Sequence, residues 1–264
     1  MSLERIVADL ADRVERRYYG KYRGIVVDND DPDRLGRLTL QVPSLLGENV
    51  VTGWATPCVP FGGAADQGFL FIPDLKAGVW VEFEGGDLEC PIWVGTYWSE
   101  PDSGSQTPKP QQDDGTEAAE VQSPPTRKII KTGKGHTIQL EDNDGAESVL
   151  VQEGVKGHKV LLDQKGITVT DAAGNIMEMA EPGTKLTDAN GNTVEMTESG
   201  MKVTDLNGNV MELAQAGITL TDATGNTIAM TDSAMKLTAK VPFTIDAAGQ
   251  PVQIVAASID LKKG

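Results

Sequence analysis

The chain has 264 residues, of which 39 are acidic and 23 basic, so its formal net charge at pH 7 is −16. A negative field of this size repels phosphate backbones and disfavours nucleic-acid binding as the main task. No run of about 18 apolar residues occurs, which excludes a transmembrane helix. Abundant glycine and few aromatic residues favour turn-rich structure, and the fold class that we predict is all-β.

The first predicted element is an N-terminal helix over residues 3–18. Its apolar residues recur at helical spacing, Ser2 can cap it and Gly20 can end it. The segment is charged from Glu4 onward and lacks the apolar core of a secretory signal. The apolar stripe can either pack on its own domain or dock onto a partner subunit, and it consists of Leu3, Ile6, Val7, Leu10 and Val14.

Residues 20–98 read as short strands with tight turns. Twelve of the thirteen aromatic residues lie between Tyr18 and Trp98, so a globular core of ordinary kind can form there. Five or six strands in about eighty residues suit a small closed barrel, and the OB-fold barrel is the leading candidate. We interpret Cys58 and Cys90 as thiols that fill this core.

Residues 99–127 carry five prolines and a single large aliphatic residue, Val121. Such a stretch cannot bury enough apolar surface to offset the entropy of ordering it. We therefore predict a Pro-rich linker over residues 99–127, followed by a separate domain over residues 128–264.

A 17-residue repeat occupies residues 166–233, where four units align without gaps. Each unit holds two short alternating runs, which predict two strands. Asp171 to Asn175 supplies the turn between the first two runs, and Gly174 is available there for a positive φ. Stacked identical units of this kind are typical of a solenoid or a fibre.

The inward positions of the repeat form columns of apolar residues. We predict that these residues are the core of a needle: Val169, Leu186, Val203 and Leu220 in one column, with Met177, Val194, Met211 and Ile228 in a second, and Met179, Met196, Leu213 and Met230 in a third.

One narrow coil of such repeats is under-stabilised, because the few apolar side chains of a unit offset less than the ordering entropy of its residues. Three chains wound around one axis close the core on all sides and remove free edges. We therefore predict an intertwined trimeric β-helix with two strands per chain in each repeat. If all of residues 129–262 form strands, including the apolar pairs between Phe243 and Leu261, each chain contributes about 16 of them.

The first hundred residues carry a set of motifs that resembles the OB-fold domain of phage baseplate assembly protein V and VgrG spike proteins. The pieces occur in the order and spacing of that family: Asn29 to Pro32, the Gly36–Arg37 pair, Val42–Pro43, Trp54, Pro73, Gly78, the run from Phe83 to Asp87, Pro91 and Gly95. A glycine-rich β-repeat after this domain is also what the family shows.

The resemblance implies a trimeric central spike at the tip of a contractile phage tail or a phage-tail-like injection system. Such a spike is driven through the target envelope when the sheath contracts, so it meets the target membrane transiently and the inner tube indirectly. The large hub domain that precedes the barrel in VgrG is lacking here, so a separate hub protein of the baseplate is expected. The predicted helix over residues 3–18 is placed to face that hub.

Two departures from the family bear on the tip. No lysozyme domain fits between barrel and needle, because only residues 99–127 intervene. Some phage spikes end in a His-x-His motif that holds a metal, whereas this chain ends in IDLKKG. We therefore predict a separate PAAR-type tip cap protein, contacting Ile259, Leu261 and Gly264.

The turn residues and the two histidines are also candidates for binding metal ions. The repeated Asp171, Asp188, Asp205 and Asp222 could form a calcium ladder, although the alternative is that they bond their own turn backbone. His136 or His158 could bind a metal as a ring of three imidazoles on a threefold axis, but a solvated strand residue is the ordinary interpretation.

The sequence thus predicts a structural protein with no catalytic residues and no cofactor, made in the cytoplasm and assembled into a tail or injection-system particle. The competing hypothesis is a secreted single-chain β-solenoid, acting as an adhesin or a calcium-binding surface module. The sequence does not distinguish a phage from a bacteriocin-like particle or a cellular injection system.

Overall fold

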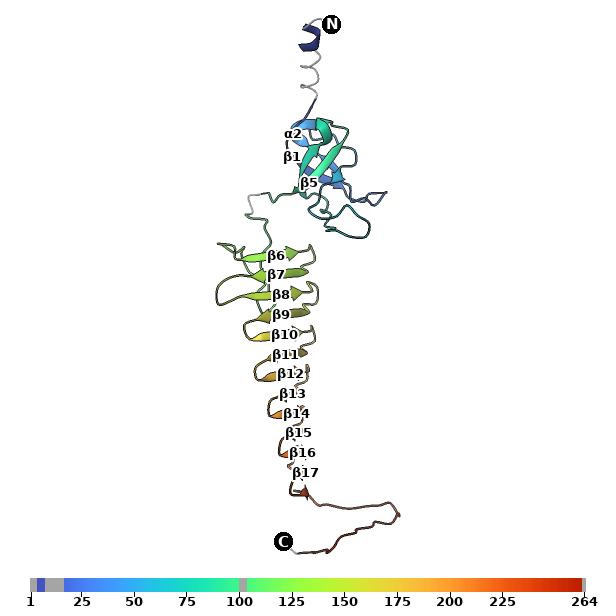
Figure 1. Cartoon of the computed structure of the whole chain (residues 1–264), viewed down its shortest axis with the longest axis vertical. Helices are drawn as coiled ribbons and strands as arrows, with labels where there is room; N and C mark the ends of the chain where they lie inside the picture. Colours follow the sequence, from blue (N-terminus) through green and yellow to red (C-terminus); the bar gives the residue numbers. More distant parts are fainter. Residues whose placement is uncertain (1–3, 8–16, 100–103, 263–264) are drawn as a thin grey trace. The chain divides into compact units, whose positions relative to one another are not determined.

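The computed structural model describes residues 4–7, 17–99 and 104–262. The chain divides after Thr107 into two compact units. Nearly all the regular secondary structure of both units is β-strand, which confirms the all-β fold class (Figure 1).

The first unit holds one five-stranded sheet in the order β2-β1-β4-β5-β3. Bridges from Leu38 to Ala55 and from Gln41 to Val51 link the β2 region to the segment that leads into β3, so hydrogen bonds join the two ends of this order. The elements are β1 (Tyr22–Asp28), β2 (Thr39–Gln41), α2 (Pro43–Leu46), β3 (Thr56–Pro57), β4 (Gly78–Phe83), η1 (Glu84–Gly86) and β5 (Pro91–Thr96).

Strict alternation builds the core of this barrel. Along β4, Val79, Val81 and Phe83 are buried while the residues between them are less covered. This is the period of two that places successive side chains on opposite faces of a strand. The buried apolar cluster comprises Val26, Leu38, Leu40, Val42, Ala55, Val79, Val81, Phe83 and Trp93.

A buried carboxylate organises the loop between β1 and β2. Asp31 accepts hydrogen bonds from the backbone N–H of Leu35 at 2.7 Å and from the Arg37 guanidinium at 2.6 Å. The Arg37 guanidinium also lies over the ring of Trp54. The hydrogen bond from the Arg37 side chain is the main reason why the pKa of Asp31 lies far below its usual range.

The second unit is a 13-stranded antiparallel sheet in which every strand pairs only with its neighbours in the chain. Figure 1 shows the strands stacked one after another, each short and crossing the long direction of the sheet. The upper strands are β6 (Arg127–Lys131), β7 (Thr137–Glu141), β8 (Ser148–Gln152) and β9 (Lys159–Asp163). The repeat forms β10 (Gly166–Thr170), β11 (Ile176–Ala180), β12 (Gly183–Thr187), β13 (Thr193–Thr197), β14 (Gly200–Thr204), β15 (Val210–Ala214), β16 (Gly217–Thr221) and β17 (Thr227–Thr231), and β18 (Met235–Thr238) follows.

Each 17-residue unit supplies two five-residue strands, as predicted. A five-residue turn joins them on one edge of the sheet, and a two-residue turn leads into the next unit on the other edge. The glycine that opens a unit is required by close approach: a Cβ on Gly183 would lie 1.9 Å from the carbonyl oxygen of Met196 on the facing strand. The same approach recurs at Gly166, Gly200 and Gly217.

Part of the segment predicted as a linker lies against the second unit's own sheet. Gln111 exchanges two hydrogen bonds with the side chain of Gln139, each of 2.9 Å. The Gln152 amide donates to the carbonyl of Gly115 at 2.8 Å, and the Lys131 ammonium donates to the carbonyl of Lys109 at 3.1 Å. Residues 108–126 thereby cover one face of β6 to β9 and bury Leu150 and Leu161 there. The domain boundaries themselves stay a prediction.

Three expectations need correction or fall outside the described residues. Residues 239–262 form no strand where the structure describes them, because the 17-residue spacing is lost after β18 and the apolar pairs find no neighbouring strand. Cys58 and Cys90 are exposed rather than core-filling, since both lie at strand ends. Of the predicted N-terminal helix, Glu4 to Val7 is helical, while Leu3, Leu10 and Val14 lie outside the described residues.

The Asp31 cluster predicts the effect of an exchange to Asn. The Asp31→Asn variant keeps the side-chain shape but leaves the Arg37 guanidinium with only the exposed Asp33 carboxylate as an ionised partner, so we expect the thermal midpoint of the barrel to fall by several degrees at pH 7. Because the folded-state pKa of Asp31 is depressed, its contribution is present above the unfolded-state value of about 3.9 and is lost as pH falls below it. Thermal unfolding followed by near-UV circular dichroism measures both effects.

The matched control for this prediction is Asp33→Asn. The Asp33 side chain also bonds Arg37 but is 66% exposed, so its exchange should lower the midpoint far less. Equal effects of the two exchanges would contradict the role assigned to the buried carboxylate.

Candidate functional site: one apolar face of the long sheet

One face of the long sheet carries two columns of side chains that are apolar except at Thr184, and we call it the apolar face. The register sets residues of neighbouring strands directly opposite each other, as with Val169 and Met177, then Met177 and Leu186. The first column runs through Val169, Met177, Leu186, Val194, Val203, Met211, Leu220, Ile228 and Leu237. The second runs through Ile167, Met179, Thr184, Met196, Met201, Leu213, Ile218, Met230 and Met235.

All twelve residues predicted as needle core lie on this face. Two of the predicted columns interleave into the first column, because antiparallel pairing alternates the two strands of each unit. The prediction left out Ile167, Met201, Ile218 and Met235, which complete the second column. The sequence indicates these residues, because the second position of each 17-residue unit lies two residues before the fourth and therefore on the same face of the strand.

The apolar face is half covered along its whole length. From Val169 to Met230, the most exposed residues of this face retain between 36% and 40% of their accessible surface. Neighbours in the same sheet supply the cover, and among the described residues no second layer lies over the columns. A continuous apolar surface of this size is typical of an interface.

The face continues upward through β6 to β9. Ile138 lies opposite Val151, and Leu140 lies opposite Val149, which extends both columns. Ile130, Ile138, Leu140 and Val151 are between 45% and 51% exposed. The packed segment 108–126 therefore covers only the other face of the sheet. Among the described residues, the chain that leaves β18 approaches the apolar face at its lower end, and the rest of the face stays uncovered.

The opposite face of the repeats is polar and alternates in charge. In its central row Glu178 faces Lys185, Lys185 faces Glu195, and Glu195 faces Lys202. The ammonium of Lys185 lies 3.0 Å from the carboxylate of Glu195. Opposite charges directly across a strand pair stabilise the register. The sheet thus has one face suited to water and one suited to an apolar partner.

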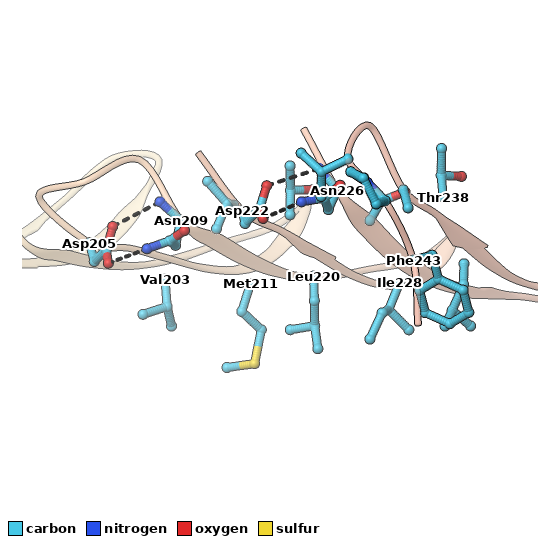
Figure 2. Close-up of a pocket in the computed structure, with 17 residues that line it drawn as sticks. Val203, Asp205, Asn209, Met211, Leu220, Asp222, Asn226, Ile228, Thr238 and Phe243 are labelled. Carbon is cyan, nitrogen blue, oxygen red and sulfur yellow. Dashed lines mark hydrogen bonds between the residues drawn. The ribbon is translucent and has the colours of Figure 1, made fainter. Parts of the chain in front are cut away.

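The lower part of the apolar face forms a groove of about 770 Å³. Val203, Met211, Leu220 and Ile228 point into it from the first column, and Phe243 approaches from the chain that leaves β18 (Figure 2). Figure 2 also shows that the paired Asp205–Asn209 and Asp222–Asn226 side chains lie at the turn edge, away from these apolar groups. The groove is part of the apolar face rather than a separate cavity.

The five-residue turns of the repeat are held by one recurring set of hydrogen bonds. The Asp188 carboxylate accepts the backbone N–H of Asn190 at 2.9 Å and of Asn192 at 2.8 Å, and it accepts the Asn192 side-chain amide at 2.6 Å. The side-chain Oδ1 of Asn192 then accepts the backbone N–H of Leu206 in the next turn, at 2.9 Å. Each turn is therefore closed internally and tied to its successor.

These contacts confirm that the repeated aspartates are turn residues. Hydrogen bonds, chiefly from the asparagine amide of the same turn, lower the pKa of Asp171, Asp188 and Asp205, and they lower that of Asp222 to about 2. The stabilisation that depends on the ionised form is present above the unfolded-state value of about 3.9 and is lost as pH falls below it.

The positions of the two histidines differ from the sequence prediction, which placed them within strands. His136 and His158 end turns rather than standing within strands, and each ring accepts a backbone N–H at Nδ1. No cluster of three or more His, Cys, Asp or Glu side chains suited to a metal ion occurs within the described ranges.

The predicted docking residues are exposed where the structure describes them. On the helical turn, Ile6 is 48% and Val7 57% exposed; near the C-terminus, Ile259 is 60% and Leu261 93% exposed. Gly264 lies outside the described residues.

The barrel carries an exposed aromatic cluster that was not predicted from the sequence. Phe69 packs edge-on against both Phe61 and Phe71, and all three are more than half exposed. The sequence feature that corresponds to this cluster is a run of large apolar residues between two glycine-rich turns.

The fold and this face define a class: a small barrel domain followed on the same chain by a long repetitive sheet with one uncovered apolar face. Residues 22–98 match the family model described as the type VI secretion system/phage-baseplate injector OB domain. The match confirms, over those residues, the resemblance to baseplate protein V and VgrG-like proteins. A search of curated proteins found no match.

The match supports a structural role in a phage baseplate or an injection system, assembled with other components of the particle. Among the helices in the described part of the chain, none has both the length and the apolar character needed to span a membrane.

The turn contacts predict the effect of removing one asparagine. The Asn192→Ala variant leaves the Leu206 N–H without its acceptor, which costs about 1 kcal/mol, and also opens the turn at Asp188. We expect a lower midpoint for guanidinium unfolding of the long sheet, followed by far-UV circular dichroism.

Asn190→Ala is the matched control, because the Asn190 amide makes only a 3.4 Å contact with the same carboxylate. We expect this variant to unfold close to the wild type. If Asn190→Ala lowers the midpoint as much as Asn192→Ala, the tie between turns is not what stabilises the sheet.

Proposed function

We propose that this chain is the central spike of a contractile phage tail or a phage-tail-like injection system, acting as a homotrimer that pierces the target envelope when the sheath contracts. The observation that carries the proposal is the apolar face, which is continuous over thirteen strands and follows an injector-type OB domain on the same chain.

The apolar face favours three copies for a geometric reason. Each five-residue strand contributes two side chains to the face, so the sheet is narrow, roughly 17 Å across. Two such sheets placed face to face leave the core open to water along both long sides. Three sheets around a common axis enclose it, with the turns at the corners and the charged rows outside.

A trimer of this kind suits mechanical work. Its axial stack of strands is bonded through backbone hydrogen bonds, and its core is shielded from water along its length. The row in which Glu178, Glu195 and Glu212 alternate with lysines faces outward in such a trimer, and the chain's net charge of −16 would repel anionic membrane surfaces. No catalytic residue or cofactor is part of the proposal.

The two ends of the chain complete the proposed assembly. Ile6 and Val7, with Leu3, Leu10 and Val14, would face a hub protein of the baseplate. Ile259, Leu261 and Gly264 would contact a PAAR-type cap protein at the tip. The exposure of Ile6, Val7, Ile259 and Leu261 supports partners at both ends.

The trimer is tested by native mass spectrometry of the purified full-length chain, which we expect to give three chain masses. The Leu220→Glu variant would bury three carboxylates in the core at a cost of more than about 3 kcal/mol each, so we expect dissociation or aggregation. Ala229→Glu places the same carboxylate on the opposite face of the sheet, directly across from Lys236, and should remain trimeric.

A stable monomer whose long sheet resists proteases would overturn the spike proposal. If a chelator also lowered the melting temperature of that monomer, the result would favour the calcium-binding surface module instead.

A further inference from the structure

Six turns along one edge of the long sheet share a single hydrogen-bond pattern. In each, the first residue donates its backbone N–H to the carbonyl of the last residue, over 2.8 to 3.0 Å. The pairs of first and last residues are Thr132 and His136, Glu153 and His158, Asp171 and Asn175, Asp188 and Asn192, Asp205 and Asn209, and Asp222 and Asn226. The two upper turns thus match the repeat turns although they lie outside the repeat.

The side chain of the last residue ties each turn to the next one, and we call each such bond a rung. In the four lower rungs the acceptor is an asparagine Oδ1. Three of these bind the N–H of the residue after the next turn's first residue, and that of Asn226 binds the N–H of Lys240 in the segment after β18. In the two upper rungs the acceptor is a histidine Nδ1. His136 accepts from Gly154 at 3.2 Å, and His158 accepts from Ala172 at 3.1 Å.

Protonation removes the acceptor of a histidine rung but does not affect an asparagine rung. A backbone N–H can only donate, so each histidine must present an unprotonated Nδ1 and carry its proton on Nε2. A second proton turns Nδ1 into a donor and removes the acceptor. Histidine side chains generally take up that proton between about pH 5 and 8, whereas an asparagine amide does not titrate there.

We propose that His136 and His158 make the upper end of this turn ladder sensitive to acid, so that the two upper rungs open as pH falls through the range in which histidine titrates. The four asparagine rungs stay closed over the same range. The sheet would therefore have a lower part indifferent to mild acid and an upper part, from β7 to β11, that loosens in it.

The charged groups around the two histidines make the expected response to acid clearer at His158 than at His136. The Nδ1 of His136 lies 3.8 Å from the Glu153 carboxylate, which offers a protonated ring another partner. Among the described residues no carboxylate oxygen lies within 4.0 Å of a His158 ring nitrogen. The Asp171 carboxylate in the facing turn is bound by the N–H groups of Ala173 and Asn175, and the Lys159 ammonium next to His158 donates to the Asp113 carbonyl.

The carboxylates of the lower turns do not provide a competing switch. The hydrogen bonds that lower the pKa of Asp171, Asp188, Asp205 and Asp222 keep them ionised well below the histidine range. The inference does not depend on the proposed spike function.

Hydrogen exchange followed by mass spectrometry on the full-length chain tests the proposal. After correction for the intrinsic pH dependence of exchange, we expect protection at Ala172 and Gly154 to fall about three- to tenfold between pH 7.5 and 5.0, the equivalent of about one hydrogen bond. Protection at Leu206 and Ala223, behind asparagine rungs, should not change. Equal behaviour of the two groups would overturn the proposal.

Three variants separate protonation from a general loss of structure. His158→Asn restores the repeat's own acceptor, so protection at Ala172 should become independent of pH. His158→Ala should lower that protection at both pH values. Asn192→His should move the acid sensitivity to Leu206. Persistence of the pH effect at Ala172 in His158→Asn would refute the assignment to this ring.

Discussion

A sheet one layer thick leaves one set of side chains without a second layer, and this constraint governs the long unit of the molecule. Backbone pairing is complete from strand to strand, because each of the thirteen strands bonds its chain neighbours. Water can solvate the row of Glu and Lys side chains on one face. It cannot solvate Val169, Leu186 or Leu220 on the other, so the chain alone satisfies its hydrogen bonds but not its apolar surface.

Where the sheet does acquire a second layer, the cover comes from its own chain and from polar groups. Gln111, Gln139 and Gln152 anchor the segment 108–126 through amide and carbonyl bonds, although that segment has few large apolar residues. Hydrogen bonding to charged and amide groups therefore ordered a stretch whose composition suggested an extended linker. Composition measures how much apolar area a segment can bury, but it does not count the polar partners that a neighbouring face can offer.

The sequence predicted those features that depend on local periodicity. The alternation of residues such as Met177, Glu178 and Met179 indicated strands, and the fixed spacing of Asp171 and Asn175 indicated turns. Ordered motifs from Asn29 to Gly95 indicated the barrel. What it could not predict depends on contacts between distant residues: the tie from His158 to Ala172, the exposure of Cys58 and Cys90, and the failure of residues 239–262 to form strands. No local pattern distinguishes a histidine that accepts a backbone N–H from one in solvent.

Because the turn contacts repeat from unit to unit, the length of the sheet can change without a change in the way its units contact one another. Asn175, Asn192, Asn209 and Asn226 each bind a backbone group fourteen residues ahead, so no contact of the ladder reaches beyond the adjacent unit. Removing or duplicating one unit would rejoin identical surfaces and change the reach of the sheet by about 9.6 Å, two strand spacings. The length of the sheet can thus vary by whole units through recombination at the DNA level, while the strands at the junction gain partners equivalent to those they lose.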